Sequence, residues 1–475
     1  MPSRKDQLHS YQFMMQRVVS SLMVHETDPE QTPLRRGVGA AFAGIMIAAL
    51  VAVIFGVIGV FTNVGGSGWR ENGSIILEEE TGATYVYHDG AVRPVLNYAS
   101  ARLISGQPQA EAHRLSTGDL AGVPRGVTVG IPGAPDSLPA RDQTLGMPWS
   151  TCEVPGEDTA GTPTTTTTLM VGERPPGGAP LGQRGLLVRD TSDGATYLVW
   201  RGHRYPIAGD TPESVVRSLY GAGREPVETG AAWLNVLPAG QAIEPIAVPA
   251  RGEDSTAVPG RTVGEVVYHP ITGGMRQHYL VLDDGLAPLT DLQVRVLQGQ
   301  QPTEPQRVSA QEAGQAPTSR ALAPAGGETE PPETPPGLAS LPADGRISLC
   351  SVTSGVGATP EIRLGVDTAN LRAGVETSVA SGTGARLADR VFVPPGRVAV
   401  VRALPSSTAR AGAFSVVTDR GLRFPVPSRE ELAALGFQPG DAVDAPETLV
   451  RRIPSGPTLS AAAAMRAAPV HGPVG

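Results

Sequence analysis

Lysine is almost absent from this chain of 475 residues: Lys5 is the only one, and every other basic side chain is an arginine. A P-loop needs a lysine that reaches the β and γ phosphates of a nucleotide, and Schiff-base enzymes and Ser-Lys hydrolases need one at the reacting centre. Because Lys5 precedes the long apolar run described below, none of these sites is expected in the rest of the chain.

Other catalytic and binding motifs are missing as well. No G-x-S-x-G motif occurs, and the eight histidines are scattered, with neither His269 nor His278 near a cysteine or second histidine at metal-ligand spacing. The net charge is −8 and no basic run lies outside the N-terminal region, so nucleic acid is not an expected partner. The sequence therefore predicts no enzyme, no bound metal and no cofactor.

Aromatic residues make up only 4% of the chain, whereas glycine and proline number 58 and 45. This composition is typical of short strands, many turns and irregular loops rather than of helical bundles. We therefore expect a fold that is mainly β with some α (α+β), most of it in one elongated domain.

Charge is missing from one long segment. Residues 38–61 include no charged residue, Asn, Gln or Pro, and a stretch of this length after a polar N-terminal segment indicates a transmembrane helix rather than a cleaved signal peptide. Five basic residues precede it, and Arg70 alone stands among the first 20 residues after it. Because basic residues favour the cytoplasmic side, we expect residues 1–37 in the cytoplasm, a single-pass anchor in the inner membrane, an exterior (periplasmic) domain over 62–460 and a flexible tail over 461–475.

The chain has two cysteines, Cys152 and Cys350, and both fall in the expected exterior domain, where the environment permits disulfides. A disulfide between them is the favoured interpretation, and two free buried thiols are the alternative. The bond would join a shared core near its two ends.

Four degenerate copies of one motif recur at about 75–106, 186–221, 266–299 and 399–436. The first two copies share an identical GATY, and all four pass from an aromatic residue through an apolar run to a glycine and then a proline. This pattern predicts a β-hairpin with glycine at the turn and proline ending the return strand, followed by a helix. The equivalent positions are the aromatics Tyr85, Tyr197, Tyr279 and Phe414, the glycines Gly90, Gly202, Gly285 and Gly421, and the prolines Pro94, Pro206, Pro288 and Pro425.

Further features extend the repeated unit. Each helix is expected to stop at a glycine, namely Gly106, Gly221, Gly299 and Gly436. Three copies carry another proline at 30, 32 and 29 residues after the hairpin proline, which gives Pro124, Pro238 and Pro454, and copy three lacks it. The segments between copies should form a central β core, with the threonine run from Thr162 and the proline-rich stretch from Ala323 as mobile, exposed insertions.

An apolar stripe also runs along the N-terminal segment. An amphipathic helix is expected there, and the side chains on its apolar face are Leu8, Tyr11, Met15, Val18, Val19 and Leu22. A segment of this size cannot build its own core, so the stripe needs a cover, either another protein or the lipid surface.

Together these features resemble the EccB family, a membrane component of the actinobacterial type VII (ESX) secretion system. The specific elements are "SYQFMMQRV" from Ser10, the GATY repeats, "IPGAPDSLP" from Ile131, and the placement of Cys152 and Cys350. The resemblance implies a scaffold role in protein export, with the FtsK-like motor ATPase EccC, the membrane proteins EccD and EccE, and other EccB protomers as partners. The "VHETDPE" that begins at Val24 is more acidic than is common in the family, so cytoplasmic contacts should differ in detail.

Two classes of function remain open at this stage. A scaffold subunit of the secretion complex needs no chemistry of its own, and its repeats offer surfaces for other protomers and for cell-wall polymer. The alternative is an independent membrane-anchored wall-binding protein or wall enzyme, which would need a polar catalytic cluster or an aromatic sugar platform. Four tryptophans spread over the chain do not provide such a platform, so the scaffold is favoured.

Overall fold

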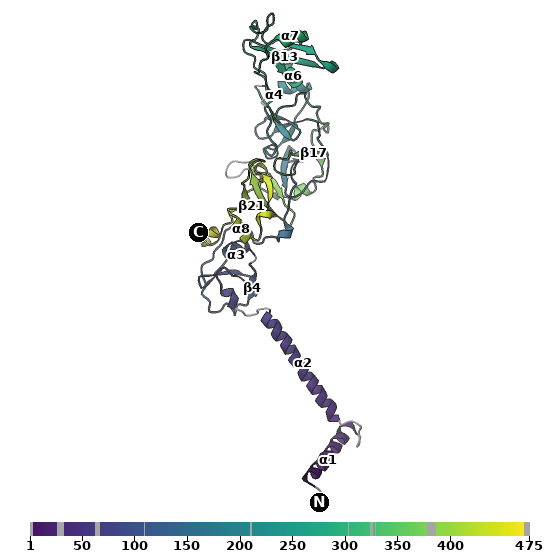
Figure 1. The fold of residues 1–475 in the computed structure, drawn as a ribbon, viewed down its shortest axis with the longest axis vertical. Coiled ribbons are helices and arrows are strands. Elements are labelled where there is room, and N and C mark those ends of the chain that lie inside the picture. The colour runs from purple at the N-terminus through teal and green to yellow at the C-terminus, as the bar shows by residue number, and fades with distance from the viewer. Residues whose placement is uncertain are drawn as a thin grey trace. The chain divides into compact units, whose positions relative to one another are not determined.

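The computed structural model describes residues 3–25, 33–61, 67–108, 110–209, 211–302, 304–323, 326–327, 329–377 and 386–469. It divides into two compact units, Met1–Arg70 and Glu71–Gly475 (Figure 1). The second unit is mixed α and β with many short strands, which confirms the expected fold class.

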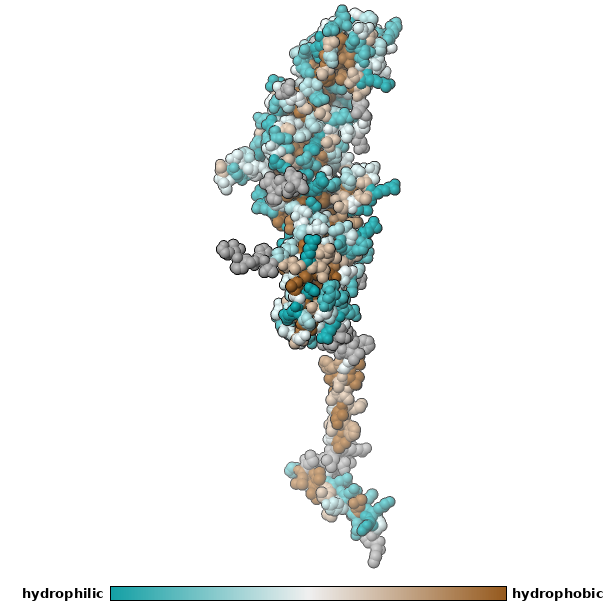
Figure 2. Space-filling view, turned by 90° about the vertical axis from the view of Figure 1, so that its left-hand side faces the viewer, coloured by the Kyte–Doolittle hydropathy of each residue, from teal (hydrophilic) through white to brown (hydrophobic). Residues whose placement is uncertain are grey.

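The first unit contains two long helices, α1 (Arg4–Val24) and α2 (Pro33–Phe61). Among the described residues, α2 is the one helix long and apolar enough to cross a membrane, over Gly37–Val57 with a mean hydropathy of 2.6. Its described side chains are exposed all round, and Figure 2 shows them as an apolar column. A helix that is apolar on every face requires an apolar surrounding, as a bilayer provides.

Each copy of the repeated motif forms a sheet of four strands with a helix before the last strand. The chain order within each sheet is third, second, first, fourth, and the fourth strand runs parallel to the first because the helix carries the chain back. The elements are β1 (Ile75–Glu78), β2 (Thr84–His88), β3 (Ala91–Pro94), α3 (Tyr98–Ser105) and β4 (Ala112–Leu115) in copy one; β8 (Leu186–Asp190), β9 (Thr196–Trp200), β10 (His203–Ile207), α4 (Pro212–Tyr220) and β11 (Val227–Thr229) in copy two; β12 (Val266–Pro270), β13 (Arg276–Leu282), β14 (Gly285–Leu289), α6 (Asp291–Gln300) and β15 (Gln306–Arg307) in copy three; and β20 (Val398–Leu404), β21 (Ala413–Thr418), β22 (Arg423–Val426), α8 (Arg429–Ala434) and β23 (Val443–Pro446) in copy four.

A sheet of seven strands lies among the copies, and its strand order is β18-β19-β6-β5-β16-β17-β7. The strands are β5 (Trp149–Glu157), β6 (Pro163–Met170), β7 (Gly177–Pro180), β16 (Leu349–Thr353), β17 (Glu361–Val366), β18 (Val375–Glu376) and β19 (Arg390–Phe392). The threonine run expected as a mobile insertion is β6, so that prediction was wrong. Thr167 and Thr168 are both buried, because β6 lies between two neighbours and β-branched side chains suit such a strand.

The first unit also contains η1 (Ser67–Arg70). Short helical segments complete the second unit, namely η2 (Arg141–Gln143), α5 (Ala231–Leu234), η3 (Thr272–Gly274), α7 (Ala310–Gln315), η4 (Asn370–Ala373), η5 (Pro439–Asp441), α9 (Glu447–Val450) and α10 (Ala461–Ala464). Helix α10 begins the segment expected as a flexible tail, yet it packs against α3 and buries Ala464. Of that expected tail, 470–475 lie outside the described residues.

Shared cores fix how the copies contact one another. The largest core joins the seven-stranded sheet to the first strands of copies two and four, through residues such as Leu349, Val188 and Val401. A second core joins α3 of copy one to α8 of copy four, and a third joins α4 of copy two to α6 of copy three. Copies one and four therefore form one pair, and copies two and three form another. Copy four and copy two connect these pairs to the central sheet.

Candidate assembly site

The disulfide lies within the central sheet. Cys152 on β5 pairs directly with Cys350 on β16 in antiparallel register, and a disulfide joins them. The bond links neighbouring inner strands of the sheet, so the expectation that it joins the core near its two ends was wrong. Both cysteines are completely buried, among Val154, Met170 and Leu371.

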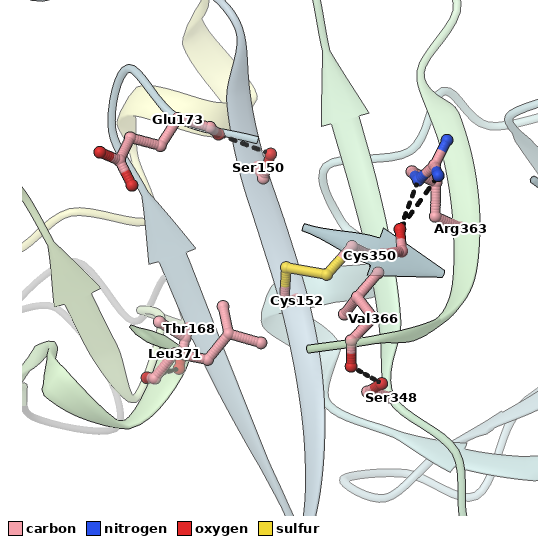
Figure 3. Close-up of a disulfide and its surroundings, with 10 residues drawn as sticks. Ser150, Cys152, Thr168, Glu173, Ser348, Cys350, Arg363, Val366 and Leu371 are labelled. Atoms are coloured by element: carbon pink, nitrogen blue, oxygen red, sulfur yellow. Dashed lines mark hydrogen bonds between the residues drawn. A yellow bond between two sulfur atoms is a disulfide. The ribbon is translucent and has the colours of Figure 1, made fainter. Parts of the chain in front are cut away.

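Hydrogen bonds tie the strands around this disulfide to adjacent segments (Figure 3). The hydroxyl of Ser348 donates to the carbonyl of Val366 at 2.8 Å, and the hydroxyl of Thr168 donates to the carbonyl of Leu371 at 3.1 Å. The disulfide spans 198 residues of sequence, so it restrains a long loop in the unfolded chain and contributes up to about 5 kcal/mol to stability by the chain-entropy model.

The hairpin positions identified from sequence are only partly equivalent in space. Tyr85, Tyr197 and Tyr279 lie directly across from the prolines of their own copies. In copy four Ser415 occupies that position, and Phe414 pairs one residue further along with Val426. The longer turn of copy four shifts the register, so Phe414 is not the structural counterpart of the tyrosines.

The four hairpin glycines also differ in their surroundings. Gly90 and Gly202 have φ of 75° and 71° at the second position of two-residue turns, where the left-handed conformation favours glycine. Gly421 has the same conformation in the longer turn of copy four. Gly285 instead lies in β14, and a Cβ there would overlap the carbonyl oxygen of Pro317, so close backbone approach explains this glycine.

A closing segment contacts the third strand in every copy. Pro124, Pro238 and Pro454 each accept a hydrogen bond from a backbone N–H of that strand, and Pro317 accepts one from Leu286 at 2.8 Å. The expectation that copy three lacks this proline was therefore wrong, because its "APTS" occupies the place of "VPRG", "LPAG" and "IPSG". Pro317 follows Pro288 by 29 residues, so the spacing alone carries the signal.

The residue two positions after this proline is a glycine wherever its neighbour on the third strand has a large side chain. It is Gly126, Gly240 and Gly456 in three copies, where a Cβ would crowd Arg93, Tyr205 and Phe424 respectively. Copy three has Ser319 here, and the position equivalent to those three neighbours is the small and fully buried Ala287; the hydroxyl of Ser319 donates to the carboxylate of Asp284 at 3.0 Å. The glycine is thus needed only where a large side chain lies next to it.

The two pairs of copies use equivalent arginines. Arg102, fifth in α3, donates through Nε to the carbonyl of Ala434 at the end of α8, at 3.0 Å. Arg295, fifth in α6, donates through Nη1 to the carbonyl of Leu219 near the end of α4, at 3.1 Å. Carbonyls at a helix C-terminus lack partners within the helix, so a guanidinium from the paired copy satisfies them.

Gly299 contributes to the second of these pairs. It was expected to end its helix, but α6 continues to Gln300, and a Cβ at Gly299 would overlap Ser218 of α4. The glycine therefore allows two helices to approach closely. The other expected stops do lie at or just beyond helix ends, with Gly106 and Gly221 as the C-cap residues of α3 and α4.

One carboxyl group is buried on the strand that carries Cys152. Glu153 on β5 accepts a hydrogen bond from the hydroxyl of Thr167 at 2.5 Å, while its Oε2 has no partner among the described residues. Burial raises the pKa of Glu153 to about 7, although hydrogen bonds from Thr167 and the backbone of Gly230 lower it. No periodic pattern marks this glutamate, so sequence reasoning missed it.

The N-terminal stripe lies on α1. Five of its residues are between 48% and 74% exposed, namely Leu8, Tyr11, Met15, Val18 and Leu22, and Val19 is half-buried. Helical spacing places them on one face, as the sequence predicts. Phe13, on the opposite side, and Met14 are also exposed, and the guanidinium of Arg17 lies over the Phe13 ring at 5.6 Å, so apolar surface on α1 extends beyond the stripe.

Comparison with known proteins places these features in a family. The family model described as "Type VII secretion system ESX-1, transport TM domain B", that of EccB, matches residues 1–470. The chain belongs to the EccB family. It is 29% identical to the protein named ESX-3 secretion system ATPase EccB3 from Mycolicibacterium smegmatis, over 96% of this chain and 89% of that protein. It is also 29% identical to ESX-2 secretion system ATPase EccB2 from Mycobacterium tuberculosis, over 98% and 95% of the two chains.

Solved EccB-family structures share this fold. A chain in the structure of an intact ESX-5 inner membrane complex superposes with a TM-score of 0.65 at 26% identity, covering 99% of this chain and 96% of that chain. A chain in the EccB3 dimer from the ESX-3 core complex superposes with a TM-score of 0.63 at 25% identity, covering 83% of this chain and all of that one. The likeness to the intact complex includes nearly the whole chain, so it extends beyond the repeats.

Proposed function

We propose that this chain is a structural subunit of an ESX-type membrane complex, forming its periplasmic portion and linking it to the cytoplasmic motor for protein export. The observation that carries the proposal is the match over 99% of the chain to a component of an intact ESX-5 inner membrane complex. A central sheet that is cross-linked by a buried disulfide and flanked by paired copies is well suited to a stable scaffold.

The same proposal sets the topology and the partners. Residues 1–37 lie in the cytoplasm, α2 crosses the membrane once, and the second unit lies outside, in accord with the basic residues before α2. The partners are other copies of this chain, a motor ATPase of the EccC type, and EccD and EccE. A solved EccB3 dimer supports contact between copies.

We further propose that the chain does not hydrolyse ATP, although its relatives carry the word ATPase in their names. Lys5 is the only lysine, so no lysine is available outside the N-terminal segment to bind the phosphates. Catalysis would therefore come from the motor rather than from this subunit.

Purification of the native membrane complex through a tag on this chain tests the proposal. The motor and the other membrane components should co-purify, and the chain purified alone should show no ATP turnover above buffer. Recovery of the tagged chain by itself from intact membranes would favour the independent wall-binding protein. ATP turnover that co-elutes with the folded chain and disappears on its unfolding would contradict the non-enzymatic role.

A further inference from the structure

A cavity of about 960 Å³ lies where copies two and three meet the segment that leads to β16. Its lining comes from the last turn of α4 and the loop after it, from α6, from the start of β8, and from residues 335–343 and Gly345. Nothing in the scaffold role described above uses this cavity.

The cavity is rich in guanidinium groups. Arg217, Arg224 and Arg295 line it, and Glu225 is the one acidic residue in the lining. Within the described part of the chain none of these arginines forms an ion pair. The neighbouring cavity shares Arg224 and Glu225 with this one, but its other two arginines, Arg189 and Arg346, are paired with Glu228 and Glu157 at 3.5 Å and 2.6 Å. Uncompensated positive charge is thus concentrated in one place on a chain of net charge −8.

Backbone carbonyls position two of these guanidiniums. Arg295 donates one N–H to the carbonyl of Leu219, and the Nε–H of Arg224 donates to the carbonyl of Tyr220 at 3.4 Å. A guanidinium has five N–H donors, so each of these groups retains donors for a ligand. Arg217 makes no side-chain hydrogen bond within the described residues and is exposed along the cavity wall.

A phenol adds a further donor. The hydroxyl of Tyr220 is buried in the lining and has no hydrogen-bond partner among the described residues. Burial raises the pKa of this hydroxyl, while the charge of Arg295 opposes the rise, so it remains protonated at neutral pH and is close to that arginine. An unpartnered buried hydroxyl costs free energy that a ligand oxygen would recover.

We propose that this cavity binds phosphate groups of an anionic polymer. Three guanidiniums, from two helices and a loop, line the cavity together with the phenol, and guanidiniums bind phosphate oxygens through bidentate, charge-assisted hydrogen bonds. The cavity is far larger than one phosphate ion, so a segment with several phosphate groups fits the volume and the spread of charge.

Calorimetry on the full chain in detergent tests the site, with short-chain polyphosphate as the probe and inorganic phosphate and polyglutamate as comparisons. Polyphosphate should bind most tightly of the three, and its affinity should fall as salt is added. Arg217→Gln should weaken its binding roughly tenfold, since loss of one charge-assisted hydrogen bond is worth about 1.5 kcal/mol. Arg189→Gln, at the ion-paired arginine of the neighbouring cavity, should leave the affinity unchanged.

Tyr220→Phe separates a ligand role from a structural one. Removal of an unpartnered buried hydroxyl should leave stability equal or higher, yet it should weaken polyphosphate binding. Absence of polyphosphate binding, or equal loss in Arg189→Gln and Arg217→Gln, would overturn the site. Equal affinity for polyglutamate would overturn the assignment to phosphate groups. Equal affinity for inorganic phosphate would overturn the assignment to a polymer.

Discussion

Arg102 donates to the carbonyl of Ala434 across 332 positions of sequence. Its other two nitrogens donate to the carbonyls of Ala110 and Pro108 at 3.1 Å and 2.7 Å, so one guanidinium joins copy one to copy four. The arginine therefore holds together two repeats that lie at opposite ends of the second unit's sequence.

Arg102→Ala should lower the free energy of unfolding of the full chain by about 2 kcal/mol, because it leaves three carbonyls without their donor. Urea unfolding followed by tryptophan fluorescence in detergent measures the change. Arg420→Ala, at an exposed turn residue, is the control and should change stability by less than about 0.5 kcal/mol. Equal stability of Arg102→Ala and the control would show that the pair does not depend on this arginine.

Gly240→Ala should destabilise the chain by about 1 to 3 kcal/mol, because the new Cβ overlaps the ring of the fully buried Tyr205. The same urea titration measures the effect. Gly337→Ala is the matched control, since its Cβ would meet no atom within 4 Å and its φ is ordinary. If both variants lose the same stability, the closing segment does not need glycine for the reason given.

Glu153 should make the chain less stable as pH rises. Its carboxyl has a pKa of about 7 when folded and an ordinary pKa of 4.5, so the folded state holds this proton more tightly. The stabilisation is complete below pH 4.5, is lost between about 4.5 and 7, and amounts to roughly 3 kcal/mol. The nearby Asp389 adds to the rise in pKa.

Unfolding free energies measured from pH 4.5 to 8 check this dependence. Over this pH range the unfolding free energy of Glu153→Gln should fall by roughly 3 kcal/mol less than that of the unchanged chain. Glu157→Gln, at the exposed end of the same strand, should leave the slope nearly as it was. Parallel curves for Glu153→Gln and the unchanged chain would show that this carboxyl titrates normally.

Local patterns predicted a large part of the fold. GATY and its relatives marked hairpins because alternation, a turn glycine and a strand-ending proline act over about ten residues. The apolar segment and the two cysteines of the expected exterior domain likewise predicted α2 and the disulfide. Those signals depend on few residues and little on the rest of the fold.

Long-range contacts were harder to predict. The threonine run became an inner strand because β5 and β19 lie on either side of it, and nothing in its own sequence shows those neighbours. Pro317 was not predicted because Ser319 stands where the other copies have glycine. The small Ala287, at the position that holds a large side chain in those copies, makes the glycine unnecessary. Arg102 and Arg295 bond carbonyls of other copies, which depends on how the repeats pair.

Co-purification and export with an altered α1 test the central claim, that this subunit links an exterior scaffold to the cytoplasmic motor. The exposed stripe contains Met15 and Val18, and each apolar side chain left in water forfeits on the order of 1.5 to 3 kcal/mol. Met15→Asp with Val18→Asp should release the motor from the tagged chain in detergent extracts and stop export. Gln12→Asp with Gln16→Asp, off the stripe, is the charge-matched control and should retain both. An intact complex with continued export in the Met15 and Val18 double variant would contradict the account.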